Sequence, residues 1–166
     1  LVLFFGGLNK SKGQDAEGRD RASMALPYAQ DKVIDALAEV NKNIVVLIVS
    51  GNAVEMPWVD NVDGIVETWF LGSQAGHAIA DVLLGKVNPS GKLPFTYPVK
   101  LEDSPAYATG SYPQTDAPIA EDIFVALVGE KSQDELMNGS SNRTTALYAE
   151  DLLVGYRWFD TKNVRP

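Results

Sequence analysis

A short charged segment near the N-terminus offers the residue types that acid/base chemistry needs. It runs Asp15-Ala16-Glu17-Gly18-Arg19-Asp20-Arg21, with three carboxyl groups and two guanidinium groups within seven residues. Gly18 allows a tight turn that would let the carboxyl group of Glu17 project into a cleft, while Asp20 and Arg21 could fix the loop through hydrogen bonds. Mixed charges on a loop more often form a solvated ion-pair network, and composition alone favours that alternative.

The elements around this segment predict an open α/β sandwich. Apolar runs over residues 1–5 and 44–49 predict two buried strands. Between them, apolar residues at helical spacing predict a helix over residues 27–40. Alternating strands and helices imply right-handed crossovers and a three-layer fold, a mainly parallel sheet with helices on both faces. The charged segment follows the first strand, at the carboxyl end of the sheet, where ligands tend to bind in such folds.

Two further elements continue the pattern. A strand is predicted over residues 64–70, and an apolar stripe over residues 75–83 predicts a helix that Gly85 ends. This stripe should pack against the sheet. Several prolines follow and exclude a helix, so residues 93–98 are expected to form an extended edge segment.

We divide the chain into three parts of one domain. Residues 1–106 are predicted to form the α/β sandwich core, and residues 107–147 a long insertion or surface loop. Residues 148–166 are predicted to add a C-terminal strand segment, because residues 152–159 have strand-forming composition. Since the sequence begins with an apolar run and no Met, we expect it to be a piece of a longer chain.

Composition narrows the classes of function. The 166 residues include 14 Lys+Arg and 22 Asp+Glu, a net charge of −8, so neither a nucleic-acid nor a membrane partner is expected, and a neutral polar substrate fits better. The absence of Cys excludes thiolate chemistry and Cys-ligated zinc, and the single histidine, His77, cannot form a metal site alone. We therefore expect no metal and no cofactor. We expect the protein to be periplasmic or secreted, although the sequence itself does not decide its compartment.

Five ordered blocks of the sequence resemble glycoside hydrolase family 3. Together they cover most of residues 6–105 and 148–160. In chain order the blocks are GLN with EGRDR and LPxxQ over residues 7–30, SGNAVEMPW over 50–58, WFLGSQAGHAIADVL over 69–83, GKVNPSGKLPFTYP over 85–98, and YAEDLLVGYRWFD over 148–160.

The resemblance implies the C-terminal (α/β)6 sandwich domain of a β-glucosidase-like enzyme, without the N-terminal barrel. In this family the nucleophilic Asp comes from the barrel, whereas the general acid/base Glu comes from a loop of the sandwich. The matching position is Glu17, with Ala16 where a Gly would precede the Glu, and Asp15 is the second choice. The implied substrate is a β-glucoside or oligosaccharide, and the implied partner is the barrel. Residues that bind the substrate are not identified.

Retaining glycosidases need two carboxyl groups about 5–5.5 Å apart, one to attack the anomeric carbon and one to shuttle a proton. On this interpretation the chain supplies the second group in an exo-acting enzyme that hydrolyses terminal β-D-glucosyl or related residues, and it is inactive alone. As an acid, Glu17 must stay protonated near neutral pH, which requires partial burial or a neighbouring carboxylate. The positive charges of Arg19 and Arg21 would favour the ionised form of Glu17 instead. At least one of these arginines is therefore expected to face away from Glu17, toward Asp20.

Two alternatives remain open. One is a non-catalytic carbohydrate-binding or interaction module of the same fold. The other is a nucleotide-binding module, but the glycines after Gly6-Gly7 are too distant for a phosphate loop. Three tryptophans could stack on sugar rings, yet we expect all of them to be packing residues: Trp58, Trp69 and Trp158.

Overall fold

A parallel sheet of three strands forms the centre of the structure, a computed structural model that describes residues 1–11, 13–16, 21–111 and 148–166. In the order β1-β2-β3, the strands are β1 (Val2–Gly7), β2 (Ile44–Val49) and β3 (Gly64–Glu67). β2 is parallel to both of its neighbours, so the carboxyl ends of all three strands lie at one edge. The two strands predicted first and the parallel sheet are confirmed.

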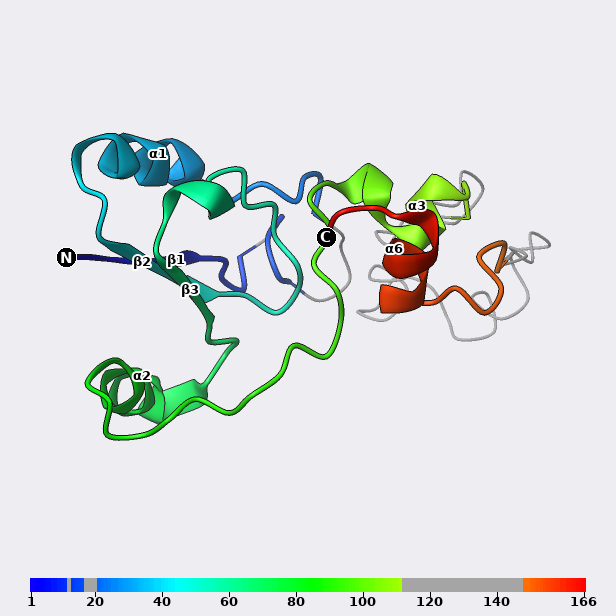
Figure 1. Ribbon diagram of the computed structural model, residues 1–166. Helices are drawn as coiled ribbons and strands as arrows, with labels where there is room; N and C mark the ends of the chain where they lie inside the picture. The colour runs from blue at the N-terminus through cyan, green and yellow to red at the C-terminus, as the bar shows by residue number, and fades with distance from the viewer. Residues whose placement is uncertain (12, 17–20, 112–147) are drawn as a thin grey trace, which may run out of the picture.

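Helices cover both faces of this sheet. Figure 1 shows α1 (Gln30–Val40) on one face and α2 (Ala75–Leu83) on the other, which confirms the three-layer α/β sandwich. Helix α1 begins three residues later than predicted, because Tyr28 and Ala29 adopt left-handed backbone conformations with φ of 59° and 56°. Helix α2 ends as predicted, with Gly85 in a left-handed conformation after it.

The main core lies between the sheet and α1. Ile44, Val46 and Ile48 of β2 are fully buried and pack with Ile34 of α1. Trp58 belongs to the same cluster and is also fully buried, and its indole Nε1 donates a hydrogen bond to Asp31 Oδ1 at 2.7 Å. The expectation that Trp58 is a packing residue is confirmed.

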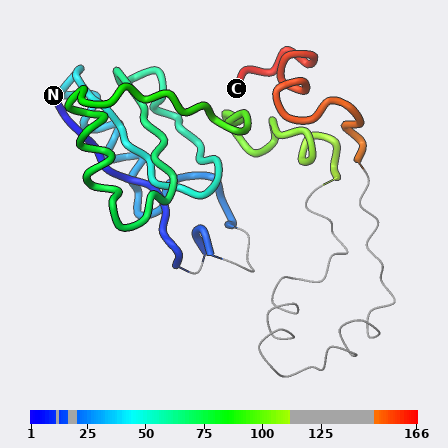
Figure 2. Tube along the Cα trace, turned by 90° about the horizontal axis from the view of Figure 1, so that it is seen from below, coloured from blue at the N-terminus to red at the C-terminus, as the bar shows by residue number. Residues whose placement is uncertain are grey.

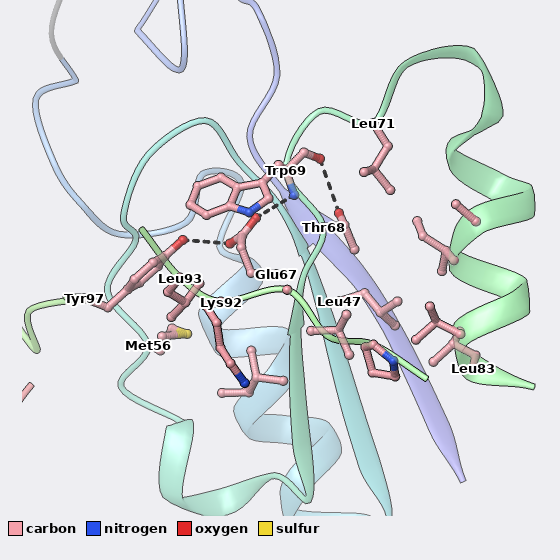
Figure 3. A pocket seen from close by; sticks show the side chains of 17 residues that line it. Leu47, Met56, Glu67, Thr68, Trp69, Leu71, Leu83, Lys92, Leu93 and Tyr97 are labelled. Carbon is pink, nitrogen blue, oxygen red and sulfur yellow. Dashed lines mark hydrogen bonds between the residues drawn. The ribbon is translucent and has the colours of Figure 1, made fainter. Parts of the chain in front are cut away.

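Packing on the α2 side is looser. The apolar stripe of α2 faces the sheet, as predicted, but it borders a cavity of about 620 Å³, and no residue of α2 is fully buried. Figure 3 shows Leu47 of β2 on one side of this cavity and Leu83 of α2 on the other. The expected close packing of the stripe on the sheet is therefore only partly formed among the described residues.

Two predicted extended segments are shorter or absent. The strand expected over 64–70 ends at Glu67, because the Glu67 carboxylate accepts a hydrogen bond from the backbone N–H of Trp69 and Trp69 turns with a φ of 54°. Residues 93–98 pair with none of the described strands, so the predicted edge segment does not join the sheet.

The prediction of a strand over residues 152–159 is wrong. Gly155, with a φ of 60°, interrupts the extended chain, and the following residues form helix α6 (Tyr156–Lys162) with Phe159 buried. Strand-forming composition did not decide between strand and helix, because a helix can bury the Phe159 side chain as well as a strand can. Figures 1 and 2 show α6 beside helix α3 (Pro105–Ala108), apart from the sheet.

Three short helical turns complete the described structure: η1 (Val59–Asn61), η2 (Gly72–Gln74) and η3 (Leu101–Asp103). Of the predicted insertion over 107–147, residues 112–147 lie outside the described residues. The division of the chain into three parts therefore stays a prediction. None of the described helices combines the length and the apolar character that a membrane span requires.

Candidate functional site

Asp15 and Arg21 are tied to each other and to the loop after β2. Asp15 Oδ2 accepts a hydrogen bond of 2.5 Å from the backbone N–H of Gly51, and Asp15 Oδ1 lies 3.8 Å from Nε of Arg21. Nη2 of Arg21 donates a hydrogen bond to the carbonyl oxygen of Ala53. The Asp15 and Arg21 side chains are only 10% and 11% exposed. We call Asp15, Arg21, Gly51 and Ala53 the loop clamp.

The loop clamp fixes both ends of the charged segment. Residues 16–20 lie between its two charged members in the sequence, and both members are attached to the chain that leaves the carboxyl end of β2. Ligands bind at this edge of open α/β sheets because the loops after neighbouring strands meet there. The clamp thus attaches both ends of the charged segment to the loop after β2.

Gln30 holds the end of β1 at the same edge. Its Oε1 accepts a hydrogen bond from the backbone N–H of Gly7 at 2.8 Å, and its Nε2 donates to the carbonyl oxygens of Gly7 and Pro27 at 2.9 and 3.0 Å. Gly7 has a φ of 131°, and a Cβ at this position would lie 2.0 Å from the carbonyl oxygen of Val49. Only glycine fits this close approach, which explains the linked GLN and LPxxQ blocks.

A second polar cluster surrounds Glu67 at the end of β3. Its carboxylate accepts hydrogen bonds from Tyr97 Oη at 2.8 Å, Ser50 Oγ at 3.2 Å and the backbone N–H of Trp69 at 2.9 Å. Figure 3 shows Tyr97 and Trp69 converging on this carboxylate. Burial, reinforced by the hydrogen bond to Glu67, raises the pKa of Tyr97 well above its ordinary value, so the phenol stays a proton donor in this contact.

The structure brings together some of the predicted site residues. Glu17, the first choice for the acid/base, lies outside the described residues, as do Arg19 and Asp20. Asp15, the second choice, is a member of the loop clamp. Arg21 contacts Asp15, a pairing that the sequence did not predict, and its expected contact with Asp20 falls outside the described part.

Other candidate residues have simpler surroundings. His77 is exposed on α2, and the described residues contain no group of three or more His, Cys, Asp or Glu placed to hold a metal ion. Trp69 packs edge-on against Phe95, with ring centroids 5.7 Å apart and planes at 68°. Sequence reasoning missed Glu67 and Tyr97; a carboxylate directly at the end of an apolar strand could have pointed to Glu67, whereas no local signal marks Tyr97.

Comparison with known proteins places these features in a family. Residues 1–156 match the family model described as the glycosyl hydrolase family 3 C-terminal domain. The chain is 53% identical to the β-glucosidase BoGH3A of Bacteroides ovatus over 168 aligned positions, and 41% identical to the thermostable β-glucosidase B of Acetivibrio thermocellus. Each alignment covers 100% of this chain but 19% and 18% of those relatives, so the chain spans about a fifth of their length.

Solved structures show the same relationship. The β-glucosidase DesR of Streptomyces venezuelae, solved with D-glucose, is 32% identical to this chain, with a TM-score of 0.73. The match covers 99% of this chain and 17% of the DesR chain. The β-glucosidase of Kluyveromyces marxianus, solved with glucose, is 30% identical to this chain, with a TM-score of 0.71. This match covers 98% of this chain and 16% of the Kluyveromyces chain. The match of sequence, parallel sheet and covering helices leads to one conclusion: the chain belongs to glycoside hydrolase family 3 and carries its C-terminal domain.

Proposed function

We propose that this chain is the sandwich part of a retaining, exo-acting β-glucosidase and that it supplies the general acid/base, Glu17. The relatives are named β-glucosidases, and both of the solved structures described above hold glucose. The nucleophile would come from a barrel domain that this sequence does not include. The substrate would be a β-glucoside or oligosaccharide with a terminal β-D-glucosyl residue.

The loop clamp is the observation that carries this proposal. A general acid must be held within hydrogen-bond reach of the glycosidic oxygen, since small displacements lower the rate strongly. Glu17 is two residues after Asp15 and four before Arg21, so the clamp restrains the segment on both sides of it. Two salt-bridged residues at the base of a loop, each bonded to the backbone of the loop after β2, suit a side chain that must be presented in one position.

Glu17 is a better proton donor than Asp15 because Asp15 already has a structural task. Its two carboxylate oxygens face the Gly51 N–H and the Arg21 guanidinium, and its side chain is 10% exposed. A carboxyl group that works as an acid must instead reach the leaving oxygen of a bound glycoside. We therefore assign Asp15 to anchoring and Glu17 to chemistry.

The reaction then has two steps. In the first, the barrel aspartate attacks the anomeric carbon while Glu17 donates its proton to the glycosidic oxygen, and the leaving alcohol departs. In the second, Glu17 removes a proton from water, which attacks the same carbon and releases glucose from the aspartyl ester. The configuration at the anomeric carbon is retained because it inverts twice.

The test uses a hybrid enzyme, in which this chain replaces the matching segment of the Bacteroides ovatus β-glucosidase, to which it is 53% identical. Glu17→Gln should lower hydrolysis of cellobiose by about 10²–10⁴-fold, the usual contribution of a general acid. An activated aryl glucoside should lose less in the step that forms the glycosyl-enzyme, because its leaving group needs little protonation. Equal loss of that step on both substrates would favour a non-catalytic module.

A further inference from the structure

The cavity between the sheet and α2 has the size of a binding site for a small molecule. Its volume of about 620 Å³ lies within the range of about 300–1,000 Å³ that ligand pockets occupy. We call it the α2 cavity. Aliphatic residues of β3, α2 and the segment after α2 line much of it: Val66, Ile79, Val82, Leu83 and Leu93. We propose that the α2 cavity binds a small amphiphile, an aliphatic monocarboxylic acid, whose carboxylate meets Lys92.

The apolar walls of the α2 cavity favour an apolar ligand body. Val66 of β3 and Ile79, Val82 and Leu83 of α2 are all only half-buried, so their side chains lack part of the contacts of a packed core. Water gains little in such a space because it finds few polar partners, whereas an apolar molecule is drawn in. An aliphatic chain would cover this surface and fill the gap between helix and sheet.

The polar side chains at the Glu67 end of the α2 cavity already have partners. The Glu67 carboxylate accepts hydrogen bonds from Tyr97 Oη, Ser50 Oγ and the backbone N–H of Trp69. Thr68 also lines the cavity, and its Oγ1 donates a hydrogen bond of 2.8 Å to a backbone carbonyl of β2. These groups do not need a ligand to satisfy them. A chain without hydroxyl groups therefore suits this end better than a sugar does.

Lys92 supplies the charge that selects the head group of the ligand. Among the described residues that line the α2 cavity, Lys92 alone is positively charged, and none of the ion pairs within the described part of the chain includes it. Figure 3 shows its ammonium group turned away from the Glu67 carboxylate. Lys92 is exposed, so its aliphatic stem can line the cavity while the ammonium group stays near water. One ammonium group at the border of an apolar space matches a ligand with one carboxylate and an apolar chain.

The test titrates the chain with octanoate, below the concentration at which octanoate forms micelles. NMR follows the indole N–H signals: Trp69 lines the α2 cavity, whereas Trp58 lies in the core on the α1 side. Octanoate should shift the Trp69 signal saturably and leave that of Trp58 unchanged. Lys92→Gln should weaken octanoate binding by about two- to fivefold, the usual range for an exposed ion pair, and leave the binding of octanol unchanged. Lys32→Gln, at an exposed position of α1, is the matched control and should change neither.

A second pair of variants tests the cavity itself. Val82→Phe places a larger side chain in the α2 cavity and should abolish the saturable shift of Trp69. Val33→Phe makes the same exchange on α1, at a residue that is 47% exposed and absent from the described lining, and should leave binding intact. If Val82→Phe does not fold, the comparison of octanoate with octylamine decides the matter in the unaltered chain. Octanoate should bind more tightly than octylamine, which has the same chain and the opposite charge.

The outcomes are distinct from those that judge the acid/base role, because octanoate binding involves neither Glu17 nor the loop clamp. A saturable Trp69 shift that is weaker in Lys92→Gln and lost in Val82→Phe supports the proposal. The absence of a saturable shift, an unchanged shift in Val82→Phe, or octylamine binding as tight as that of octanoate overturns it. Calorimetric titration of the hybrid enzyme should show the same site, again lost in Val82→Phe. Binding that is present in the chain alone but absent from the hybrid would mean that another part of the enzyme fills the α2 cavity, and would also overturn the proposal.

Discussion

The Asp15 carboxylate and the Arg21 guanidinium lie 3.8 Å apart, and each also binds the backbone of the loop that follows β2. Their side chains are about nine-tenths buried, so this pair differs from exposed ion pairs, which contribute little to stability. Removing one member would leave the other buried without its partner. The pair thus fixes the base of the segment that contains Glu17.

Substitutions in the loop clamp should therefore be strongly coupled. Asp15→Ala and Arg21→Ala should each lower the free energy of unfolding by about 2–4 kcal/mol, because each leaves a buried charge or donor unpaired. The double variant should be less unstable than the sum by about 0.5–3 kcal/mol. Urea denaturation of the chain measures all three values, and strict additivity would show that the two residues do not act as a unit.

Gly7 should tolerate no side chain. A Cβ there would lie 2.0 Å from the Val49 carbonyl oxygen, in a backbone conformation with φ of 131°, so Gly7→Ala should separate β1 from β2 and prevent stable folding. Gly13→Ala is the matched control, since Gly13 also has a positive φ, 85°, but no contacting atom of the described residues lies within 4 Å of the added Cβ. Circular dichroism melting curves should show a much larger loss for Gly7→Ala, and equal losses would contradict the close approach.

The buried indole of Trp58 provides a test of the core. Trp58→Phe should lower the free energy of unfolding by about 1–3 kcal/mol, because the partly buried Asp31 carboxylate loses the hydrogen bond from the indole. Trp158→Phe is the control: Nε1 of Trp158 has no hydrogen-bond partner among the described residues, so the substitution removes only packing. A Trp158 effect as large as that of Trp58 would show that the hydrogen bond to Asp31 contributes nothing.

Tyr97 should make stability depend on alkaline pH. Its pKa is raised in the folded state by burial and by the Glu67 carboxylate, an effect that nearby Arg21 partly opposes. The stabilisation is complete below the unfolded pKa of about 10 and is lost as the pH rises above it, because only the unfolded state then releases the proton. The stability advantage over Tyr97→Phe should shrink between about pH 9 and pH 11 in thermal melts. Tyr148→Phe, at an exposed position, controls for the loss of a tyrosine hydroxyl, and an advantage that does not change with pH would refute the assignment.

Local patterns predicted the sandwich well where periodicity and tertiary packing agree. The β-branched run over residues 44–49 became β2 without a change of boundary, and the apolar stripe over residues 75–83 became α2. The local patterns failed where one side-chain contact or one backbone angle changes the direction of the chain. Glu67 bonds the backbone of Trp69 and ends β3 early, and Gly155 converts an expected strand into α6. Such events depend on partners and backbone angles that composition does not encode.

The candidate site was predictable in position but not in detail. Asp15 and Arg21, the first and last residues of the charged segment, do lie near the carboxyl edge of the sheet, where they contact the loop after β2. The pairing of Asp15 with Arg21 and the role of Tyr97 were not predictable, because both depend on contacts between residues 30 or more positions apart: Gly51 binds Asp15, and Glu67 binds Tyr97. Sequence spacing alone gives no information about such contacts.

The central claim is that Glu17 transfers the proton while Asp15 only anchors the loop. Azide tests it most directly in the hybrid enzyme, because this anion attacks the glycosyl-enzyme without help from a base. With an activated aryl β-glucoside, Glu17→Ala should turn over slowly, and added azide should accelerate it and yield β-glucosyl azide. Asp15→Ala should show no such acceleration. Rescue of Asp15→Ala by azide, or failure to rescue Glu17→Ala, would contradict the account.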